Sequence, residues 1–284
     1  MKKYILAIDQ GTTSSRVVLY DSKFKIKSIE QKEFKQYFPN DGWVEHDAQE
    51  IWRDVEYLIS RTIKKNKLRP SQIISIGITN QRETTVLWNK KTGKPIHKAI
   101  VWQDRRTAEY CDQLKIKKKD KIIQKITGLV LDPYFSATKI KWILDRDSKN
   151  NKNQITDILF GTIDTWLLWK LTEGKSHYTD ITNASRTMIF DSNKEEWSKE
   201  LLKLFNINKS LLPEVKENAF NFGTTKIFGG NIVIGGMAGD QQAATIGQAC
   251  FNAGQSKSTY GTGCFLLMNI GSKFKISTNK LLTL

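Results

Sequence analysis

The segment YILAIDQGTTSSRVVLY, residues 4–20, decides how the fold begins. An apolar run ends at Asp9, and β-branched residues resume at Val17 after a polar stretch, which predicts a strand, a tight loop and a second strand. The DQGTTSSR loop offers backbone N–H groups and hydroxyls to phosphate oxygens, and Arg16 adds a charged fork. A carboxylate at a strand end can also hold a metal through water. We therefore expect a nucleotide phosphate site, with an ordinary polar hairpin as the alternative for GTTS alone.

Strand and helix patterns alternate along the rest of the chain. Apolar residues recur at helical spacing after Asp47, which stands where an N-cap is expected, and continue to about Lys65. The same criteria predict strands at 73–79, 85–88, 99–102, 155–160, 232–236, 256–260 and 264–268, and helices at 104–114, 162–171, 197–205 and from 240 onward. This alternation predicts an α/β fold. The chain has neither GxxxxGK[ST] nor GxGxxG, which excludes P-loop NTPases and the dinucleotide fingerprint.

A second polar motif, TNQRETT at residues 79–85, follows a predicted strand. In this motif the guanidinium of Arg82, which donates several hydrogen bonds, stands next to the carboxylate of Glu83, which accepts hydrogen bonds. This pair suits vicinal hydroxyls, because each hydroxyl both donates and accepts hydrogen bonds. A simple surface salt bridge is the alternative interpretation.

Two further groups of residues favour a ligand site. GMAGDQQAA places Asp240 and Gln241 at the start of a helix, where the helix dipole stabilises a carboxylate. A role as N-cap would account for Asp240 but not for Gln241. Trp102, Tyr134 and Phe135 stand in polar loops, where aromatic faces could pack on a carbon skeleton, and core packing is the alternative for them.

Composition excludes several other classes of protein. The 284 residues carry 45 Lys and Arg against 29 Asp and Glu, a net charge of +16, but the lysines are spread along the chain, so we expect no nucleic-acid partner. Three widely spaced cysteines and three scattered histidines support neither a disulfide framework nor a zinc site. The first apolar run is too short for a signal peptide, and no run approaches the roughly 18 residues that span a bilayer. We predict a cytoplasmic protein without membrane insertion.

Taken together, the motifs resemble those of the glycerol kinases in the FGGY carbohydrate kinase family, within the actin and hexokinase superfamily. The resemblance runs nearly collinearly from Tyr4 to Leu282, through DQGTTSSR, GWVEHD, GITNQRETT, IVWQDRRTAE, TGLVLDPYFSATK, FGTIDTWLLWKLT, TNASRTM, AGDQQAA and TYGTGCF. It implies a ribonuclease-H-like α/β domain with a mixed sheet and flanking helices. It also implies an ATP:glycerol 3-phosphotransferase, which makes sn-glycerol 3-phosphate.

The resemblance further implies a role for each matching residue. Asp240 would be the general base that accepts the proton of the terminal hydroxyl of glycerol as this hydroxyl attacks the γ-phosphorus of ATP. The residues implied to bind glycerol are Arg82, Glu83, Trp102, Tyr134, Asp240, Gln241 and Phe265. The residues implied to bind the nucleotide are Thr12, Thr13, Ser14, Arg16 and Thr262. Asp9 would support Mg²⁺.

The same resemblance divides the chain in two. Residues 1–253 would form the polyol- and phosphate-binding domain, and residues 254–284 the first hairpin of a second actin-like domain. Because members of the family are considerably longer, we expect a truncated enzyme that binds glycerol but lacks the second domain that closes over ATP. A non-catalytic polyol-binding fragment and another FGGY sugar kinase are the alternatives, and homo-oligomerisation stays open.

Overall fold

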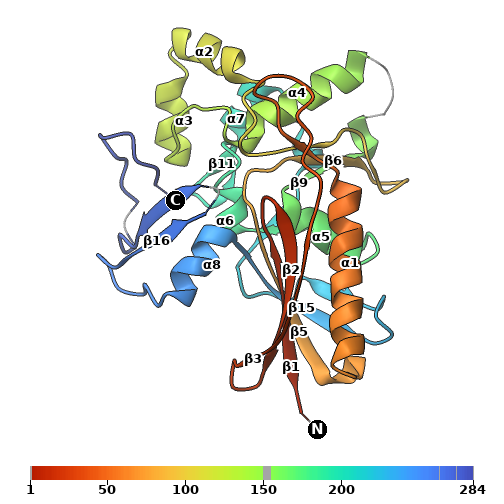
Figure 1. Ribbon diagram of the computed structural model, residues 1–284. Coiled ribbons are helices and arrows are strands. Elements are labelled where there is room, and N and C mark those ends of the chain that lie inside the picture. Colours follow the sequence, from red (N-terminus) through yellow and green to blue (C-terminus); the bar gives the residue numbers. More distant parts are fainter. Residues whose placement is uncertain (1, 150–154, 262, 273, 284) are drawn as a thin grey trace.

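The computed structural model describes residues 2–149, 155–261, 263–272 and 274–283. At the centre of these residues lies a six-stranded sheet with the strand order β14-β15-β5-β1-β2-β3 (Figure 1). Its strands are β1 (Tyr4–Gln10), β2 (Ser14–Asp21), β3 (Ile26–Glu33), β5 (Ile73–Asn80), β14 (Gly223–Thr225) and β15 (Ile232–Gly239). The inner strands β15, β5 and β1 are parallel, and the outer pairings are antiparallel. The expected α/β fold with a mixed sheet is confirmed.

The first hairpin is longer than the sequence predicted. Strands β1 and β2 pair along their whole length, so that only residues 11–13 form the turn. The N–H of Gly11 donates to the carbonyl of Ser14 at 2.9 Å and closes this turn. Asp9 and Arg16, expected in the loop, are instead cross-strand partners within the sheet.

Helices α1 (Ala48–Lys65) and α5 (Ile163–Leu171) cover one face of the sheet. Asp47 is the N-cap of α1 as predicted, and its carboxylate accepts the backbone N–H groups of residues 49 and 50 at 2.9 and 3.3 Å. Apolar side chains of both helices pack against alternate residues of β1, of which Leu6 and Ile8 are fully buried. Each such side chain contributes about 1.5–3 kcal/mol when buried, which fixes the register of the sheet on this face.

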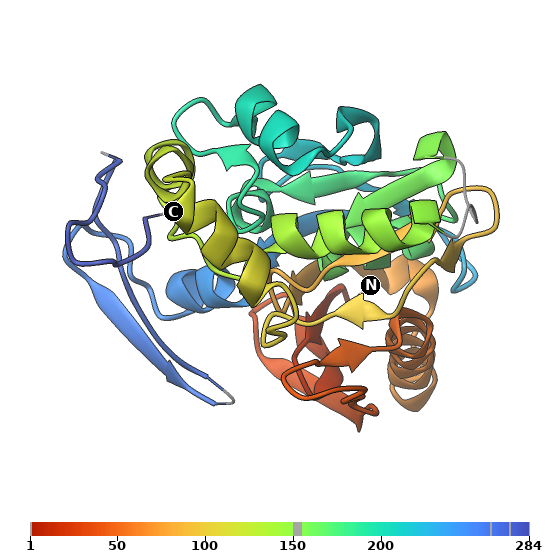
Figure 2. The same cartoon turned by 90° about the horizontal axis from the view of Figure 1, so that it is seen from above.

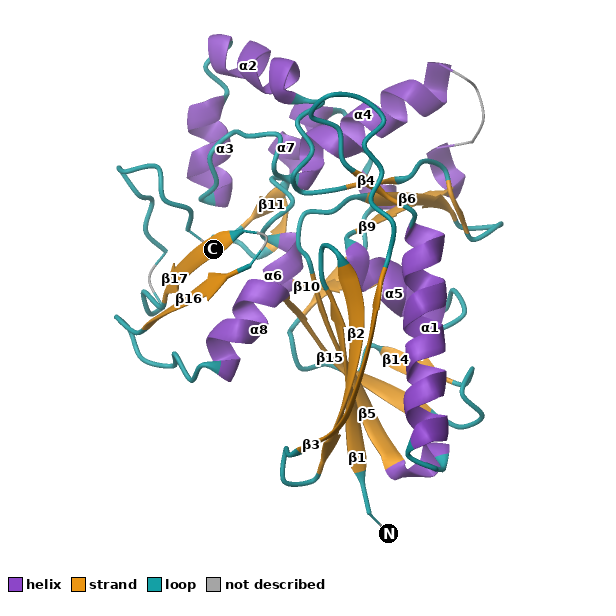
Figure 3. Cartoon of the chain, viewed as in Figure 1, coloured by secondary structure: helices purple, strands orange, loops and turns teal. Residues whose placement is uncertain are grey.

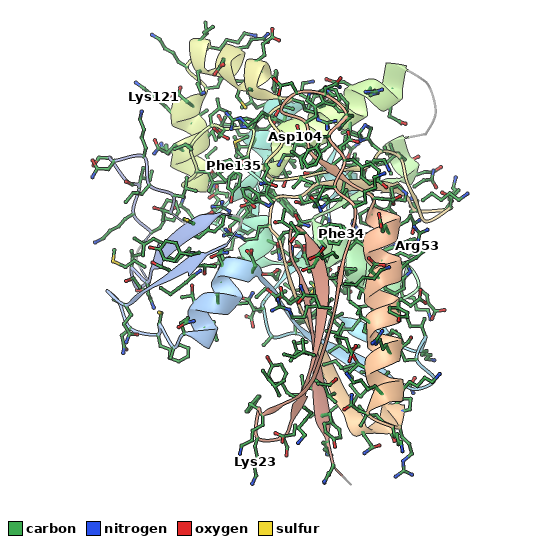
Figure 4. The ribbon with its side chains drawn as sticks, in the orientation of Figure 1. Lys23, Phe34, Arg53, Asp104, Lys121 and Phe135 are labelled. Carbon is green, nitrogen blue, oxygen red and sulfur yellow. The ribbon has the colours of Figure 1, made fainter. Side chains whose placement is uncertain are left out.

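A second layer of helices lies beyond one end of the sheet, at the top of Figure 1. It consists of α2 (Ala108–Ile116), α3 (Asp120–Thr127), α4 (Ser136–Lys149) and α7 (Lys199–Phe205). These helices form a separate apolar core that includes Phe135, which Figure 4 labels in this layer together with Asp104.

Short strands and turns connect the two layers, as the colours of Figure 3 show. The paired strands are β4 (Glu45–His46) with β8 (Ala99–Ile100), β6 (Val86–Asn89) with β7 (Lys94–Pro95) and β9 (Ile158–Gly161), β10 (Tyr178–Asp180) with β13 (Glu214–Lys216), and β11 (Phe190–Asp191) with β12 (Glu196–Trp197). A short helix, α6 (Ile181–Ala184), follows β10, and 3₁₀ turns occur at Pro70–Gln72, Ile155–Asp157 and Lys209–Leu211.

Two predicted elements begin at least three residues later than expected. The helix expected from residue 104 begins only at Ala108, because the buried carboxylate of Asp104 accepts the backbone N–H groups of Val44 and Arg106 at 2.6 and 2.9 Å and holds the chain in a loop. The strand expected from residue 155 begins at Ile158, after a 3₁₀ turn.

The last hairpin is built as predicted, from β16 (Ser256–Tyr260) and β17 (Cys264–Met268). Among the described residues, these strands pair only with each other. Figure 2 shows the hairpin at the left edge of the molecule, next to α8 (Asp240–Gly247). Its outer face exposes Tyr260, Leu266 and Met268, whereas Phe265 and Leu267 are partly covered.

Lysine and cysteine side chains occur in several separate parts of the fold. Lys23 and Lys121 lie at opposite ends of the molecule in Figure 4. Cys111, Cys250 and Cys264 are all free thiols. Within the described ranges, no helix combines the length and the apolar character needed to cross a membrane.

The buried carboxylate of Asp164, on α5, gives a prediction about stability. Burial, followed by the neighbouring Asp180, raises the pKa of Asp164 to about 7, against 3.8 for the unperturbed group. The folded state therefore holds a proton that the unfolded chain releases, and this contribution to stability is lost as the pH rises from about 4 to about 7. We expect Asp164→Asn to be more stable than the parent at pH 8 by about 1–2 kcal/mol, because losing one acceptor for the hydroxyl of Thr179 offsets part of the gain. Urea unfolding at pH 5 and pH 8 checks this, and an advantage of the variant that is equal at both pH values would contradict it.

Candidate active site

The carboxyl ends of the three parallel strands β1, β5 and β15 lie side by side at one edge of the sheet. Gln10, which ends β1, is the partner of Asn80 at the end of β5, and Asn80 is the partner of Gly239 at the end of β15. In open α/β sheets, ligands bind at this edge of the strands. The residues that follow Asn80 and Gly239 are therefore placed for ligand contact.

A cavity of about 170 Å³ opens at this edge. It is smaller than the roughly 300–1,000 Å³ of sites for drug-sized ligands and so suits a small molecule. Its lining residues are Thr12, Gln81, Arg82, Glu83, Trp102, Tyr134, Asp240, Gln241, Thr259, Gly261, Gly263 and Phe265. Every residue that the sequence implied for glycerol lies among them, and Thr12 joins them from the first loop.

Arg82 forms an ion pair with Asp240 across two strand ends. The two side chains approach to 3.1 Å between Nε and Oδ1, and Nη1 of Arg82 also donates to the side chain of Gln242 at 3.3 Å. Gly239 makes this approach possible, because a Cβ atom at that position would lie 2.6 Å from Cδ of Arg82. The surface salt bridge between Arg82 and Glu83 that the sequence left open is not formed.

Glu83 is buried, like Arg82, and faces a second arginine. Its backbone is left-handed, with φ of 61°, so the chain turns sharply and sends the adjacent side chains to different partners. The carboxylate of Glu83 pairs with the guanidinium of Arg186, and both side chains are 2% exposed. The same guanidinium lies over the ring of Tyr134, 5.2 Å from its centroid. Arg186 therefore holds two residues of the cavity wall at once.

Asp240 is available to a ligand as a proton acceptor. It is the first residue of α8, where Gly239 is the N-cap, so the N-cap alternative for Asp240 was wrong. Its side chain is 35% exposed and accepts the N–H of Gln241 at 2.7 Å. Burial raises the pKa of Asp240, and the charge of Arg82 opposes that rise. A carboxylate poised in this way can take a proton from a bound hydroxyl.

Aromatic side chains form one wall of the cavity. The ring of Trp102 meets the ring of Tyr134 edge-on at 5.6 Å and that of Phe265 at 6.0 Å between centroids. Nε1 of Trp102 donates to the hydroxyl of Thr12 at 2.9 Å, which ties this wall to the first hairpin. Burial raises the pKa of Tyr134 to about 12, so its hydroxyl stays protonated and can donate to a ligand. Phe135, which we also considered, is fully buried and belongs to the core.

The remaining residues of the first hairpin lie outside the lining of the cavity. Arg16 approaches Asp9 to 3.6 Å and donates from Nε to Gln31 at 3.1 Å. The hydroxyl of Ser14 accepts from the same Gln31 at 3.0 Å, while Thr13 is exposed at the turn. Thr262, expected on the nucleotide side, lies outside the described residues.

No described group of three or more His, Cys, Asp or Glu side chains could hold a metal ion by itself. Asp9 is a single carboxylate that is 40% exposed, at the end of a strand. Mg²⁺ typically uses one or two carboxylates and completes its shell with phosphates and waters, so Asp9 fits the expected role.

Sequence reasoning missed two charged residues of this site. Arg186 stands in the TNASRTM motif, 103 residues after its partner Glu83, and Lys257 donates from β16 to the side chain of Gln241. A charged residue inside an otherwise small and polar motif was the only available signal for Arg186. Lys257 lies on an alternating strand and gave no such signal.

Comparison with protein families gives one match that covers most of the chain. The model of the "FGGY family of carbohydrate kinases, N-terminal domain" matches residues 4–247. Residues beyond 247, including the last hairpin, lie outside that match.

Curated proteins and solved structures agree with this family match. The chain is 56% identical to a glycerol kinase of Clostridium botulinum (strain Hall) and 54% identical to one of Bacillus cereus (strain AH187), over its whole length in both cases but over only 57% and 58% of those proteins. The crystal structure of Plasmodium falciparum glycerol kinase with ADP matches 99% of the chain and 57% of its own, with 42% identity and a TM-score of 0.94. A gluconate kinase of Lactobacillus acidophilus, at 22% identity and a TM-score of 0.84, shares the fold. The chain thus spans little more than half the length of the relatives it matches.

Proposed function

The chain belongs to the FGGY family of carbohydrate kinases, and we propose that it is the acceptor-binding part of an ATP-dependent glycerol kinase that makes sn-glycerol 3-phosphate. One observation carries the proposal. Five hydrogen-bonding residues, from three separate segments of the chain, line a cavity of about 170 Å³ beside Trp102 and Phe265. The relatives named glycerol kinase, at 54–56% identity, support this choice of substrate.

The cavity offers what a three-carbon triol requires. Each hydroxyl of glycerol donates one hydrogen bond and accepts others. Arg82 supplies donors, Glu83 and Asp240 supply acceptors, and Tyr134 and Gln241 can do both. The faces of Trp102 and Phe265 would cover the carbon chain.

The reaction follows from the position of Asp240. A terminal hydroxyl of glycerol attacks the γ-phosphorus of ATP, the bond between this phosphorus and the β,γ-bridging oxygen breaks, and ADP leaves with the electron pair. The hydroxyl proton passes to the carboxylate of Asp240. Phosphoryl transfer is largely dissociative, so the base accepts its proton late and need not be strong. Holding the hydroxyl in line is the main contribution, and Arg82 orients the carboxylate for it.

We assign the phosphate side to the first hairpin. Thr12, Thr13, Ser14 and Arg16 would hold the phosphates of ATP, and Thr262 would reach the nucleotide from the other hairpin. Asp9 would hold Mg²⁺, which neutralises charge on the phosphates when bound. Thr12 links the first hairpin to the acceptor cavity, because it lines the cavity and its hydroxyl accepts a hydrogen bond from Trp102.

We place a domain boundary near residue 253. The family match ends at residue 247, and the hairpin of β16 and β17 pairs with no other strand of the described residues. Residues 1–253 would then be the polyol- and phosphate-binding domain, and residues 254–284 the beginning of the next one. A cytoplasmic location and any homo-oligomer stay predictions.

A coupled assay for ADP release tests the function. The chain is assayed alone and also joined to the part of the Clostridium botulinum relative that lies beyond the aligned residues. We expect ADP release by the joined protein to depend on glycerol, and sn-glycerol 3-phosphate to accumulate in equal amount. Release that depends on xylulose or gluconate but not on glycerol would show that the acceptor is another sugar.

A further inference from the structure

Lys257 is unusual for a lysine because it is only 5% exposed. Lysine is almost never buried unless its charge has partners. It lies on β16, and its ammonium group donates to the side-chain oxygen of Gln241 and, at 2.8 Å, to the hydroxyl of Thr259. Both partners line the cavity. The last hairpin is thereby tied to the residues that we assign to glycerol.

The contact with Lys257 fixes which way the amide of Gln241 points. An ammonium group has only donors, so the oxygen of the amide must face it. The NH₂ group of Gln241 is then turned away from Lys257, and its Nε2 lies 3.3 Å from Oδ2 of Asp240. Gln241 therefore presents donors toward Asp240 and the cavity. Without the lysine, the amide could rotate and present its oxygen there instead.

Lys257 also acts on the charge of Asp240. Among the charged groups around Asp240, Arg82 approaches it to 3.1 Å and favours its ionised form, whereas the negative charge of Glu83 disfavours that form. Burial lowers the pKa of Lys257, while the negative charge of Asp240 raises it. This attraction is mutual, so a charged Lys257 favours the ionised form of Asp240.

We propose that Lys257 is a positioning residue of the acceptor site. It orients the amide of Gln241 so that the NH₂ group points toward the polyol, and it favours the ionised carboxylate of Asp240, which accepts the proton of the polyol. The polyol part of this assignment rests on the proposed function, whereas the effect on Asp240 can be measured without any ligand. Phe265 belongs to the same hairpin, so displacement of β16 would disturb the aromatic wall as well.

The first measurement uses the free chain. Protein labelled with ¹³C at the aspartate carboxyl carbons is titrated by NMR, and the signal that disappears in Asp240→Asn identifies Asp240. In Lys257→Met, we expect the titration midpoint of Asp240 to move to higher pH. Lys121→Met, which removes the same charge from an exposed position of α3, should leave that midpoint in place. An unchanged midpoint in Lys257→Met would overturn the proposal.

The second measurement is the affinity for glycerol, read by calorimetry. Lys257→Met should weaken binding by about three- to tenfold, the effect of one lost hydrogen bond. In a Gln241→Leu background, the same substitution should weaken binding no further, because its target is gone. Equal weakening in both backgrounds would show that Lys257 does not act through Gln241. If the parent itself does not bind glycerol, the proposed function fails, and the NMR titration still decides the role of Lys257. Should Lys257→Met fail to fold, Lys257→Gln removes the charge and keeps a polar end group for the same two measurements.

Discussion

Turnover of the joined kinase should fall by about 10²–10⁴-fold when Asp240 is replaced by asparagine, the range typical for loss of a general base. Asparagine keeps the shape of the side chain and can still accept the N–H of Gln241, which Asp240 accepts at 2.7 Å. It cannot accept the proton of the attacking hydroxyl. Affinity for glycerol should change far less than turnover, because the site keeps its other polar groups. The measurement is kcat from ADP release, beside a glycerol titration of the same variant.

The dependence on pH separates this role from a structural one. Burial raises the pKa of Asp240, so the parent should lose activity as the pH falls through that raised value, where the carboxylate becomes protonated. Asp240→Asn has no such group, and its residual activity should not follow that titration. Equal turnover of parent and variant would mean that Asp240 only orients Arg82.

The second large effect concerns stability. Replacing Arg186 with methionine should lower the free energy of unfolding by about 3–5 kcal/mol, because it leaves the carboxylate of Glu83 buried without its partner. Urea unfolding of the 284-residue chain measures the loss as a lower midpoint with an unchanged slope.

A double variant provides the control. Adding Glu83→Gln to Arg186→Met removes the unpaired charge, and we expect it to recover a substantial part of the lost stability. Neither protein should bind glycerol like the parent, because Glu83 and Tyr134 lose their support. A single Arg186→Met variant as stable as the parent would contradict the assignment.

The sequence was most informative where a motif is local. DQGTTSSR after an apolar run predicted the first hairpin, and GDQQAA predicted the start of α8. Even there, local pattern did not show that Asp9 and Arg16 are paired within the sheet, because strand length depends on pairing with a neighbour.

Contacts between distant segments could not be predicted from residue types alone. Glu83 meets Arg186 because the end of β5 and the segment that follows α6 lie at the same edge of the sheet. Asp104 looked like the start of a helix, but its carboxylate serves as a buried acceptor for Val44, 60 residues earlier. The resemblance to a known family grouped the residues of the cavity, and the fold supplies the reason for the grouping, which is that three parallel strands end side by side.

The central claim is that this cavity binds glycerol, and calorimetric titration of glycerol into the 284-residue chain tests it most directly. We predict saturable binding to one site. Arg82→Ala should weaken it roughly ten- to hundredfold, since removing the guanidinium leaves Asp240 without its ion-pair partner and a glycerol hydroxyl without a donor. Lys121 does not line the cavity, so Lys121→Met should bind like the parent. No saturable heat from the parent, or an Arg82→Ala curve that overlays the parent's, would contradict the account.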